Sequence, residues 1–232
     1  MKYSLALLIL AVIPPPACLG QTASSDVKRE PPPGMVEIKI PLPKPMYVGP
    51  NVQLNLPNLE RTYPSRADSI FFAPVGTTNV ALGKAVTSSD AQPVVGEFQL
   101  LTDGVADDLA EDFVELAPGR QWVQIDLGAV QRIEKIALWH HHKLFGVYHD
   151  VIVQVSDDPE FKTGVTTLYN NDHDNSSALG AGGDPAYIET NHGRVVAGKG
   201  TKARHVRLWS NGNTNNDMNH YCEVQVYGTP VK

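Results

Sequence analysis

The chain has 232 residues, of which 42% are hydrophobic and 19% charged, a composition that suits one globular domain together with an extended segment. Residues 79 to 232 carry 12 basic and 20 acidic side chains, a net charge of −8. Nucleic acids and anionic membranes select positively charged surfaces, so this balance disfavours both. Neutral ligands and divalent cations fit better.

Residues 1 to 20 have the layout of a secretory leader, with a basic residue before an apolar run from Leu5 to Ile13. The run is too short to span a bilayer as a stable helix, so we expect cleavage near Gly20. The protein is then extracytoplasmic, either secreted or membrane-tethered. Alternatively, Cys18 is the lipidated first residue of a lipoprotein, although Pro15 stands where that signal normally has an aliphatic residue.

Residues 21 to 77 form a proline-rich linker by composition, since they contain ten of the 18 prolines. Proline lacks the amide proton that helices and central strands need, so we expect an extended, polyproline-like N-terminal segment. One stretch differs, because Val36, Ile38 and Ile40 alternate with charged residues. This pattern predicts a short strand added to the edge of a sheet, its own or a partner's. A tail wrapped on its own domain is the alternative.

The rest of the chain consists of short alternating segments divided by Gly, Asn and Asp, which predicts an all-β sandwich or barrel. Residues 122 to 127 and 132 to 139 alternate on either side of Gly128, so we expect antiparallel partners across a turn. The phase of the apolar residues shifts between Ile133 and Ile136, which indicates a β-bulge.

Residues 204 to 228 have the pattern of a closing hairpin, with two alternating strands on either side of a polar loop, 210 to 220. The loop is rich in asparagine, which favours turns and supplies amide groups for binding. The preceding hairpin places Arg120 and residues 140 to 149 at one end of the domain. Cys222 is the only cysteine after the leader, so no intrachain disulfide is expected, and its place on the apolar face predicts a buried side chain.

Several segments occur in the order seen in a known domain family. They are NVALGKAVTSSD (79–90), LTDG (101–104), WVQIDLG (122–128), IEKIALW (133–139), VIVQVSDDPEF (151–161), and RHVRLW with CEVQVYG (204–209 and 222–228). Residues 78 to 230 therefore resemble the coagulation factor 5/8 type C, or discoidin, domain, nearest to its bacterial carbohydrate-binding-module members. The resemblance implies a galactose-binding-like jelly-roll β-sandwich, generally a non-catalytic recognition module that holds ligand in loops at one end.

The resemblance also implies a structural calcium ion. The family pattern places one carboxylate in the turn after the first strands and another in the last strand, which here are Asp103 and Glu223. Carbonyl oxygens from near Leu100, Val105 and Cys222 complete the expected shell, since calcium takes six to eight oxygen ligands. We therefore expect calcium as a structural cofactor.

Sugar-binding relatives commonly use an arginine and an asparagine after the IEKIALW strand and an aromatic side chain from the last loop. The arginine is missing here, so the identity of the sugar does not follow from the resemblance. The candidate ligand-binding residues are His140, His141, His142, Tyr148, His149, Asn211, Asn213, Asn216 and His220. Imidazole, amide and aromatic groups together suit the hydroxyl groups of a sugar.

Other features leave alternatives open. His140, His142 and His149 offer three nitrogens, the minimum for a zinc or copper centre, although no tight ligand spacing supports one. The carboxylates of residues 170 to 184 offer ligands for a cation, but they lack the EF-hand pattern, and a polar loop capping the sandwich is the favoured interpretation. The apolar pair at residues 144 and 145 pins its loop to the core, contacts a membrane or stacks on a sugar.

The sequence contains no GxSxG, no phosphate-binding glycine loop and no CxxCH motif, and the acidic run 107 to 112 has the character of a solvated surface. We therefore predict a non-catalytic extracellular module that binds carbohydrate or a cell-envelope glycan through residues 140 to 149 and 210 to 220. The alternative is a docking subunit of an extracytoplasmic protein complex, which uses the strand at 36 to 40 and the same loops.

Overall fold

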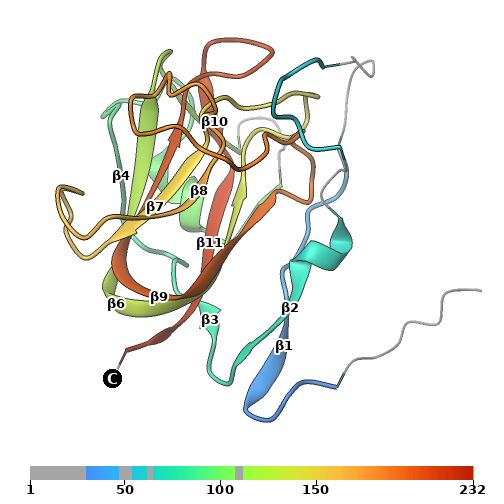
Figure 1. The fold of residues 1–232 in the computed structure, drawn as a ribbon, viewed down its shortest axis with the longest axis vertical. Coiled ribbons are helices and arrows are strands. Elements are labelled where there is room, and N and C mark those ends of the chain that lie inside the picture. The colour runs from blue at the N-terminus through green and yellow to red at the C-terminus, as the bar shows by residue number, and fades with distance from the viewer. Residues whose placement is uncertain (1–29, 47–53, 62–64, 108–111, 232) are drawn as a thin grey trace, which may run out of the picture. The chain divides into compact units, whose positions relative to one another are not determined.

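The computed structural model describes residues 30–46, 54–61, 65–107 and 112–231, so the expected leader and Cys18 lie outside the described residues. Within these ranges the regular elements are strands and short 3-10 turns, and no helix is long and apolar enough to span a bilayer (Figure 1). The elements are β1 (Met35–Lys39), η1 (Arg66–Ser69), β2 (Ile70–Pro74), β3 (Thr78–Asn79), β4 (Val86–Ser88), η2 (Phe98–Thr102), β5 (Val114–Leu116), β6 (Gln121–Trp139), β7 (Ile152–Ser156), β8 (Thr166–Asn170), β9 (Arg194–Ser210), β10 (Asn219–Tyr221) and β11 (Glu223–Pro230). The predicted all-β class is confirmed.

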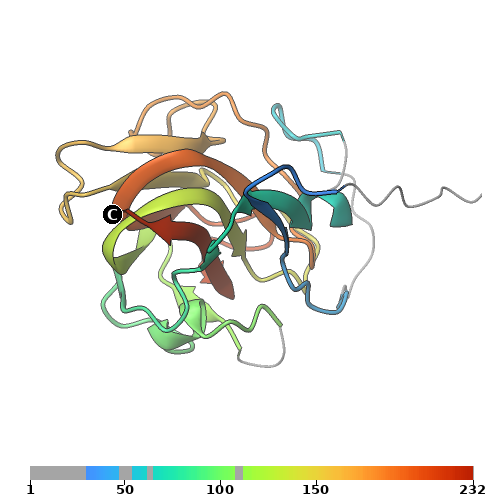
Figure 2. The same cartoon turned by 90° about the horizontal axis from the view of Figure 1, so that it is seen from below.

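Strand β6 is the longest element, and the main sheet is organised around it. The strand order is β3-β11-β6-β9-β7-β8, with β4 also paired to β6, and every pairing is antiparallel. Both β6 and β9 curve strongly (Figures 1 and 2). The first half of β6 pairs with β4 and the second half with β11, so one strand contributes to both layers of the predicted jelly-roll β-sandwich.

The two halves of β6 supply side chains to one core. Val123 and Ile125 in the first half and Ile136 and Leu138 in the second half are fully buried in the same apolar cluster. Strands β7 and β9 add their own alternating apolar rows to this cluster, as the period-two pattern predicts. Burial of this apolar surface is the main stabilising contribution to the sandwich.

The predicted hairpin about Gly128 was wrong. Residues 122 to 127 and 132 to 139 both belong to β6, and each pairs with β9 rather than with the other. Gly128 has a φ of +82°, which glycine adopts without steric cost, and its amide donates to Asp126 Oδ1. The chain therefore bends here, and the bend directs the two halves into facing layers instead of neighbouring positions in one sheet.

The bend nevertheless brings the two ends of β6 to the same end of the domain, as predicted for Arg120 and residues 140 to 149. Ser210 of β9 lies opposite Gln121 of β6, and the Ser210 Oγ is 2.9 Å from the Tyr221 hydroxyl. The Tyr221 ring centroid is in turn 4.9 Å from that of His140, which directly follows β6. Both ends of the strand therefore contribute to one end of the sandwich.

The predicted closing hairpin, residues 204 to 228, was also wrong as a strand pair. Strands β9 and β11 do not pair with each other, because β6 lies between them in the sheet. Within the loop, β10 pairs with β5 instead. Alternation of apolar and polar residues shows which side chains face inward, but it does not show which two strands are hydrogen-bonded neighbours.

The predicted β-bulge is confirmed. The register of β6 shifts between Ile133 and Lys135 on the β9 side and between Tyr227 and Gly228 on the β11 side. Gly198 lies against this bulge, and a Cβ there would be 2.4 Å from the Ile133 carbonyl oxygen. The backbone of β6 at the bulge therefore approaches β9 too closely for any residue with a Cβ at position 198.

The proline-rich segment contributes a two-stranded sheet of its own. Strand β1 pairs with β2, with Met35 opposite Pro74, so the predicted strand at 36 to 40 pairs within its own chain. Because β1 already pairs with β2, the proposed role of this strand in docking onto a partner protein loses its support. Ile40, Ala106, Ala137, Trp139, Cys222 and Tyr227 form a second buried cluster, on which Ile38, Leu42 and Phe71 pack. Cys222 is buried, as predicted.

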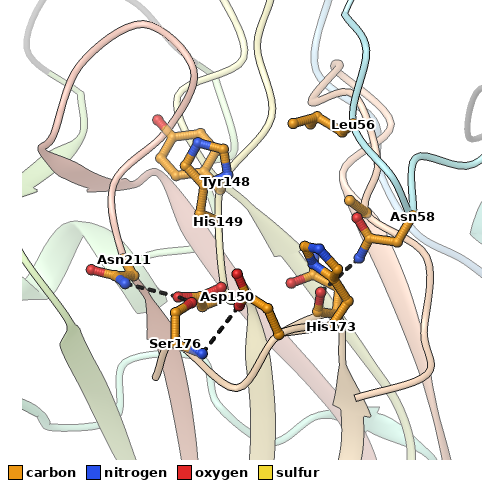
Figure 3. A pocket seen from close by; sticks show the side chains of 11 residues that line it. Leu56, Asn58, Tyr148, His149, Asp150, His173, Ser176 and Asn211 are labelled. Carbon is orange, nitrogen blue, oxygen red and sulfur yellow. Dashed lines mark hydrogen bonds between the residues drawn. The ribbon is translucent and has the colours of Figure 1, made fainter. Parts of the chain in front are cut away.

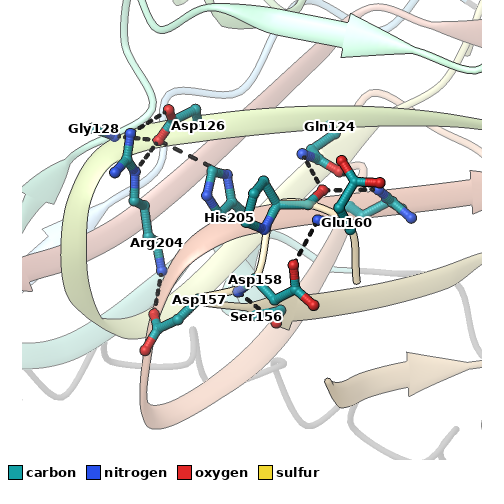
Figure 4. A network of polar contacts seen from close by, with 11 residues as sticks. Gln124, Asp126, Gly128, Ser156, Asp157, Asp158, Glu160, Arg204 and His205 are labelled. Carbon is teal, nitrogen blue, oxygen red and sulfur yellow. Dashed lines mark hydrogen bonds and ion pairs between the residues drawn. The ribbon is translucent and has the colours of Figure 1, made fainter. Parts of the chain in front are cut away.

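An ion pair ties the bend of β6 to β9 (Figure 4). Arg204 Nε and Nη2 each donate to the Asp126 carboxylate at 2.8 Å. These hydrogen bonds lower the pKa of Asp126 to about 2. The Arg204 amide also donates to Asp157 at 3.0 Å, which joins the turn after β7 to the same network. Beside it, burial lowers the pKa of His205.

Candidate functional site

A pocket of about 240 Å³ opens where three strands of the main sheet end (Figure 3). It lies between the start of β7 and the ends of β8 and β9. The lining residues are Leu56, Asn58, Tyr148, His149, Asp150, Asn171, His173, Asp174, Ser176, Ala186 and Asn211. Amide, imidazole, carboxylate and hydroxyl groups therefore surround one shallow space that also has apolar walls.

Asp150 is the central polar group of this pocket. It has a φ of +52°, a left-handed conformation that aspartate tolerates better than most residues, and it lies just before β7. Its Oδ2 accepts hydrogen bonds from Ser176 Oγ and Asn211 Nδ2, each at 2.8 Å. The backbone N–H of Asn211 donates to the His149 carbonyl oxygen at 2.9 Å. The loops after β6, β8 and β9 are thus held around one carboxylate.

The loop from 170 to 184 supplies further carboxylates. Oxygens of Asp150, Asp172 and Asp174 lie within 4.8 Å of one another. Asp172 is fully buried and accepts backbone hydrogen bonds from Ser176 and Ser177, each at 3.0 Å. Hydrogen bonds from Ser176 also lower the pKa of Asp174. The carboxylates of this loop therefore fold it into a cap over the strand ends.

His140 and His142 are buried rather than exposed to a ligand. His140 Nδ1 is 2.9 Å from Glu189 Oε2, and its ring stacks on Tyr148 at 4.2 Å between centroids. His142 Nε2 is 2.9 Å from the Ala106 carbonyl oxygen. Among the described residues, these two imidazoles and His149 do not gather at a common point, so the arrangement does not favour a transition-metal centre.

His141, His220 and Tyr148 form a second polar and aromatic cluster behind the pocket. Both ring nitrogens of His220 make hydrogen bonds, since Nδ1 is 2.9 Å from the Tyr148 hydroxyl and Nε2 is 2.9 Å from Glu115 Oε2. Burial lowers the pKa of His220. The His141 ring lies 4.7 Å from Phe113 between centroids. These side chains support the loops, and Tyr148 alone of them also lines the pocket.

The asparagines of the last loop have different tasks. Asn211 lines the pocket, whereas Asn213 donates to Asn216 Oδ1 at 2.8 Å and to the Met218 carbonyl at 2.9 Å within the loop. Asn219 is fully buried and joins this loop to the segment before β6. Sequence reasoning missed Asn219, because a structural asparagine looks like any other in an asparagine-rich loop.

Asp103 and Glu223 lie close together, as the resemblance implied. Glu223 is fully buried, and its carboxylate oxygens have no close hydrogen-bond partner among the described residues, although the Gln225 side chain and the Gly104 amide interact with it weakly. Burial and the charge of Asp103 raise the pKa of Glu223 to about 8. Asp103, exposed at the end of η2, accepts a hydrogen bond from the Val105 amide at 2.8 Å.

This pair fits a cation. A buried carboxylate beside a second, exposed one at a tight turn suits a hard divalent ion, which would also remove the electrostatic cost of the buried charge. The other expected contributors lie close to the pair along the chain, with Leu100 in η2, Val105 two residues after Asp103, and Cys222 directly before Glu223. The acidic run 107 to 112 lies mostly outside the described residues.

One predicted feature and one that was not predicted remain to be placed. Leu144 is exposed, and the Phe145 carbonyl accepts a hydrogen bond from Asn215 at 3.2 Å, so this tip contacts the last loop. Leu56 and Asn58 line the pocket although they lie in the proline-rich segment. Sequence reasoning missed them, because composition alone places that segment outside the domain and no local pattern marks them.

Neither a protein-family model nor a curated protein sequence matches the chain. Its structural neighbours include carbohydrate-binding modules. Chitosan-binding module 1 of a chitosanase/glucanase from Paenibacillus sp. IK-5 has a TM-score of 0.44 and 22% identity, with 65% of this chain and 99% of that chain covered. The CBM32 of AlyQ, in complex with 4,5-unsaturated mannuronic acid, has a TM-score of 0.39 and 16% identity, with 61% and 92% covered.

A family 89 glycoside hydrolase from Clostridium perfringens is also similar, with a TM-score of 0.49 and 16% identity. The match covers 67% of this chain, which spans only 15% of that enzyme.

Proposed function

We propose that the protein is a non-catalytic carbohydrate-binding module and that the pocket around Asp150 is its binding site. The observation that carries the proposal is the combination of groups at the strand ends. Asp150 and the amide groups of Asn58 and Asn211 surround a space that also has Tyr148 and Leu56 in its walls. Sugars present alternating hydroxyl groups and apolar C–H faces, and such a mixed lining is complementary to both.

The predicted ligand-binding residues divide between two tasks under this proposal. Tyr148, His149 and Asn211 contact the glycan, and the other predicted histidines and asparagines hold the loops in place. The pocket volume of about 240 Å³ lies below the about 300–1,000 Å³ of enclosed small-molecule sites. We therefore propose recognition of a short stretch of a carbohydrate or cell-envelope glycan rather than enclosure of a whole ligand.

We further propose that Asp103 and Glu223 bind a structural calcium ion, with carbonyl oxygens near Leu100, Val105 and Cys222. When bound, the ion supplies positive charge that compensates the buried carboxylate. Glu223 begins β11 and Asp103 directly follows η2, so an ion bound to both would link the last strand to the loop before β5. The support for this role is the buried carboxylate of Glu223, which lies beside Asp103 and has no close hydrogen-bond partner among the described residues.

We also propose an extracytoplasmic location, supported by the leader-like residues 1 to 20. Extracellular glycans are then available as partners. The acidic composition of residues 79 to 232 continues to disfavour nucleic acid and anionic membranes.

The test is binding of the purified protein to a glycan array in the presence of calcium, followed by titration calorimetry with the best probe. Asn211→Ala removes one amide from the pocket and one hydrogen bond to Asp150, so we expect affinity to fall about tenfold. Asn215→Ala is the matched control, because Asn215 is an exposed asparagine of the same loop that does not line the pocket. Failure of the wild-type protein to bind any glycan, or equal loss in both variants, contradicts the proposal.

A further inference from the structure

The segment from 54 to 61 runs along the domain as an additional strand-like edge. Leu59 forms a parallel bridge with Ala186, the Glu60 amide donates to the Ala186 carbonyl at 2.8 Å, and the Ala186 amide donates to the Asn58 carbonyl at 2.9 Å. These are backbone contacts between a proline-rich stretch and a loop more than a hundred residues later. They hold the segment in one register.

Side chains fix the same contact. Asn58 Nδ2 donates to the Asn171 carbonyl at 2.7 Å, directly after β8. Glu60 Oε2 accepts from Arg194 Nη2 at 2.9 Å, and both side chains are largely buried, at 16% and 17% exposure. The Arg194 guanidinium lies 4.1 Å from the Tyr187 ring centroid, so it is held from two sides.

This docking places two side chains of the segment in the pocket wall. Figure 3 shows Leu56 and Asn58 on the opposite side of the pocket from Tyr148 and His149, with Asp150 between the two sides. Because the Asn58 amide nitrogen is already bonded to Asn171, its oxygen is left to accept a hydrogen bond from a ligand hydroxyl. Leu56 offers an apolar surface for the C–H face of a sugar ring.

We propose that Leu56 and Asn58 are specificity-determining residues of the binding site, and that Glu60 is a positioning residue which holds them there. The proposal rests on the proposed carbohydrate function. It means that the binding unit begins before residue 56, within the proline-rich segment, and not at residue 78. A protein that starts at residue 78 keeps the sandwich but loses one wall of the site.

The proposal is tested with full-length Leu56→Ala, Asn58→Ala and Glu60→Gln. Calorimetric titration uses chitotriose, a galactose disaccharide and a mannuronate trimer as probes. We expect Leu56→Ala and Asn58→Ala each to weaken the tightest probe by about tenfold and to change the ratio of affinities among the probes, as expected for loss of one buried contact or hydrogen bond. Glu60→Gln weakens the ion pair that holds the segment, so we expect it to shift the ratio of affinities in the same direction as the two alanine variants.

Asn191→Ala is the matched control, since Asn191 donates to the Pro43 carbonyl at 3.0 Å and so anchors the same N-terminal stretch away from the pocket. Hydrogen exchange of residues 54 to 61 shows whether the segment stays docked in each variant. If Leu56→Ala and Asn58→Ala bind like wild type while Asn211→Ala loses affinity, the wall is not part of the site and this inference fails alone. If the wild type binds none of the probes and no array glycan, the proposed function fails with it.

Discussion

Glu223→Gln is the substitution that best separates a structural calcium site from a buried acid. In the absence of metal, the Glu223 carboxyl has its pKa raised from 4.5 to about 8 by burial and by Asp103. The folded state therefore holds the proton more tightly than the unfolded state. Stability is then greatest below about pH 4.5 and is lost as the pH rises towards 8, because the folded chain must either keep the proton or bury a charge.

The magnitude follows from the difference between the two pKa values. Each pKa unit corresponds to about 1.36 kcal/mol, so the step from 4.5 to about 8 costs at most about 5 kcal/mol of unfolding free energy at pH 8. Calcium binding recovers this loss, since the ion stabilises the ionised carboxylate. Glutamine is similar in shape and does not titrate, so the variant has neither the loss nor the recovery.

Urea unfolding followed by tryptophan fluorescence measures both effects at about pH 5 and about pH 8, with chelator or with calcium. We expect the wild type in chelator to be several kcal/mol less stable at the higher pH, and calcium to restore it there. The Glu223→Gln protein shows neither response. Equal wild-type stability at both pH values in chelator, or calcium stabilisation of the variant, refutes the reasoning.

Two further predictions concern the framework of the site. Asn219→Ala removes hydrogen bonds to Ser210, Gly212, Ala117 and Gly119, all between 2.8 and 2.9 Å, and should lower the unfolding free energy by roughly 2–4 kcal/mol in urea titrations; a change below 1 kcal/mol would contradict it. Arg204→Ala should raise the pKa of Asp126 from about 2 towards 3.8 in a carboxyl NMR titration. The stabilisation from this pair is present above about pH 3.8 and lost as the pH falls towards 2, so an unchanged Asp126 pKa would refute the assignment.

The sequence predicted the parts of the fold that depend on local pattern. Alternation identified the inward rows, such as Val151, Val153 and Val155, all of which are buried, and the phase shift after Ile133 identified the bulge. Strand partners could not be predicted in this way. Period-two alternation looks the same in a hairpin and in one long bent strand, so it predicts two paired strands where the structure has the single strand β6.

The site was predicted less completely, for two physical reasons. Histidine in a polar loop has the composition of a surface group, yet His140 is fully buried against Glu189 and Tyr148, because a paired imidazole tolerates burial. Leu56 and Asn58 reach the pocket through long-range contacts of their segment, which are backbone pairing with Ala186 and side-chain contacts with the loop after β8 and with β9, and no local pattern encodes these. The pocket is thus formed by tertiary contacts between segments that sequence reasoning treated separately.

The curved pairing of β6 with β9 has a consequence for the rate at which the protein reaches its folded state. The ladder runs from Leu138 opposite Arg194 to Gln121 opposite Ser210, so the chain enclosed between partners lengthens continuously along it. Closing the shorter enclosed loop costs less entropy, which favours pairing that starts near Leu138 and proceeds around the bend. Such non-local ladders fold slowly, in about milliseconds to seconds. Asn211 and the pocket follow the last rung, so we expect ligand binding to be recovered after most of the sheet in refolding experiments.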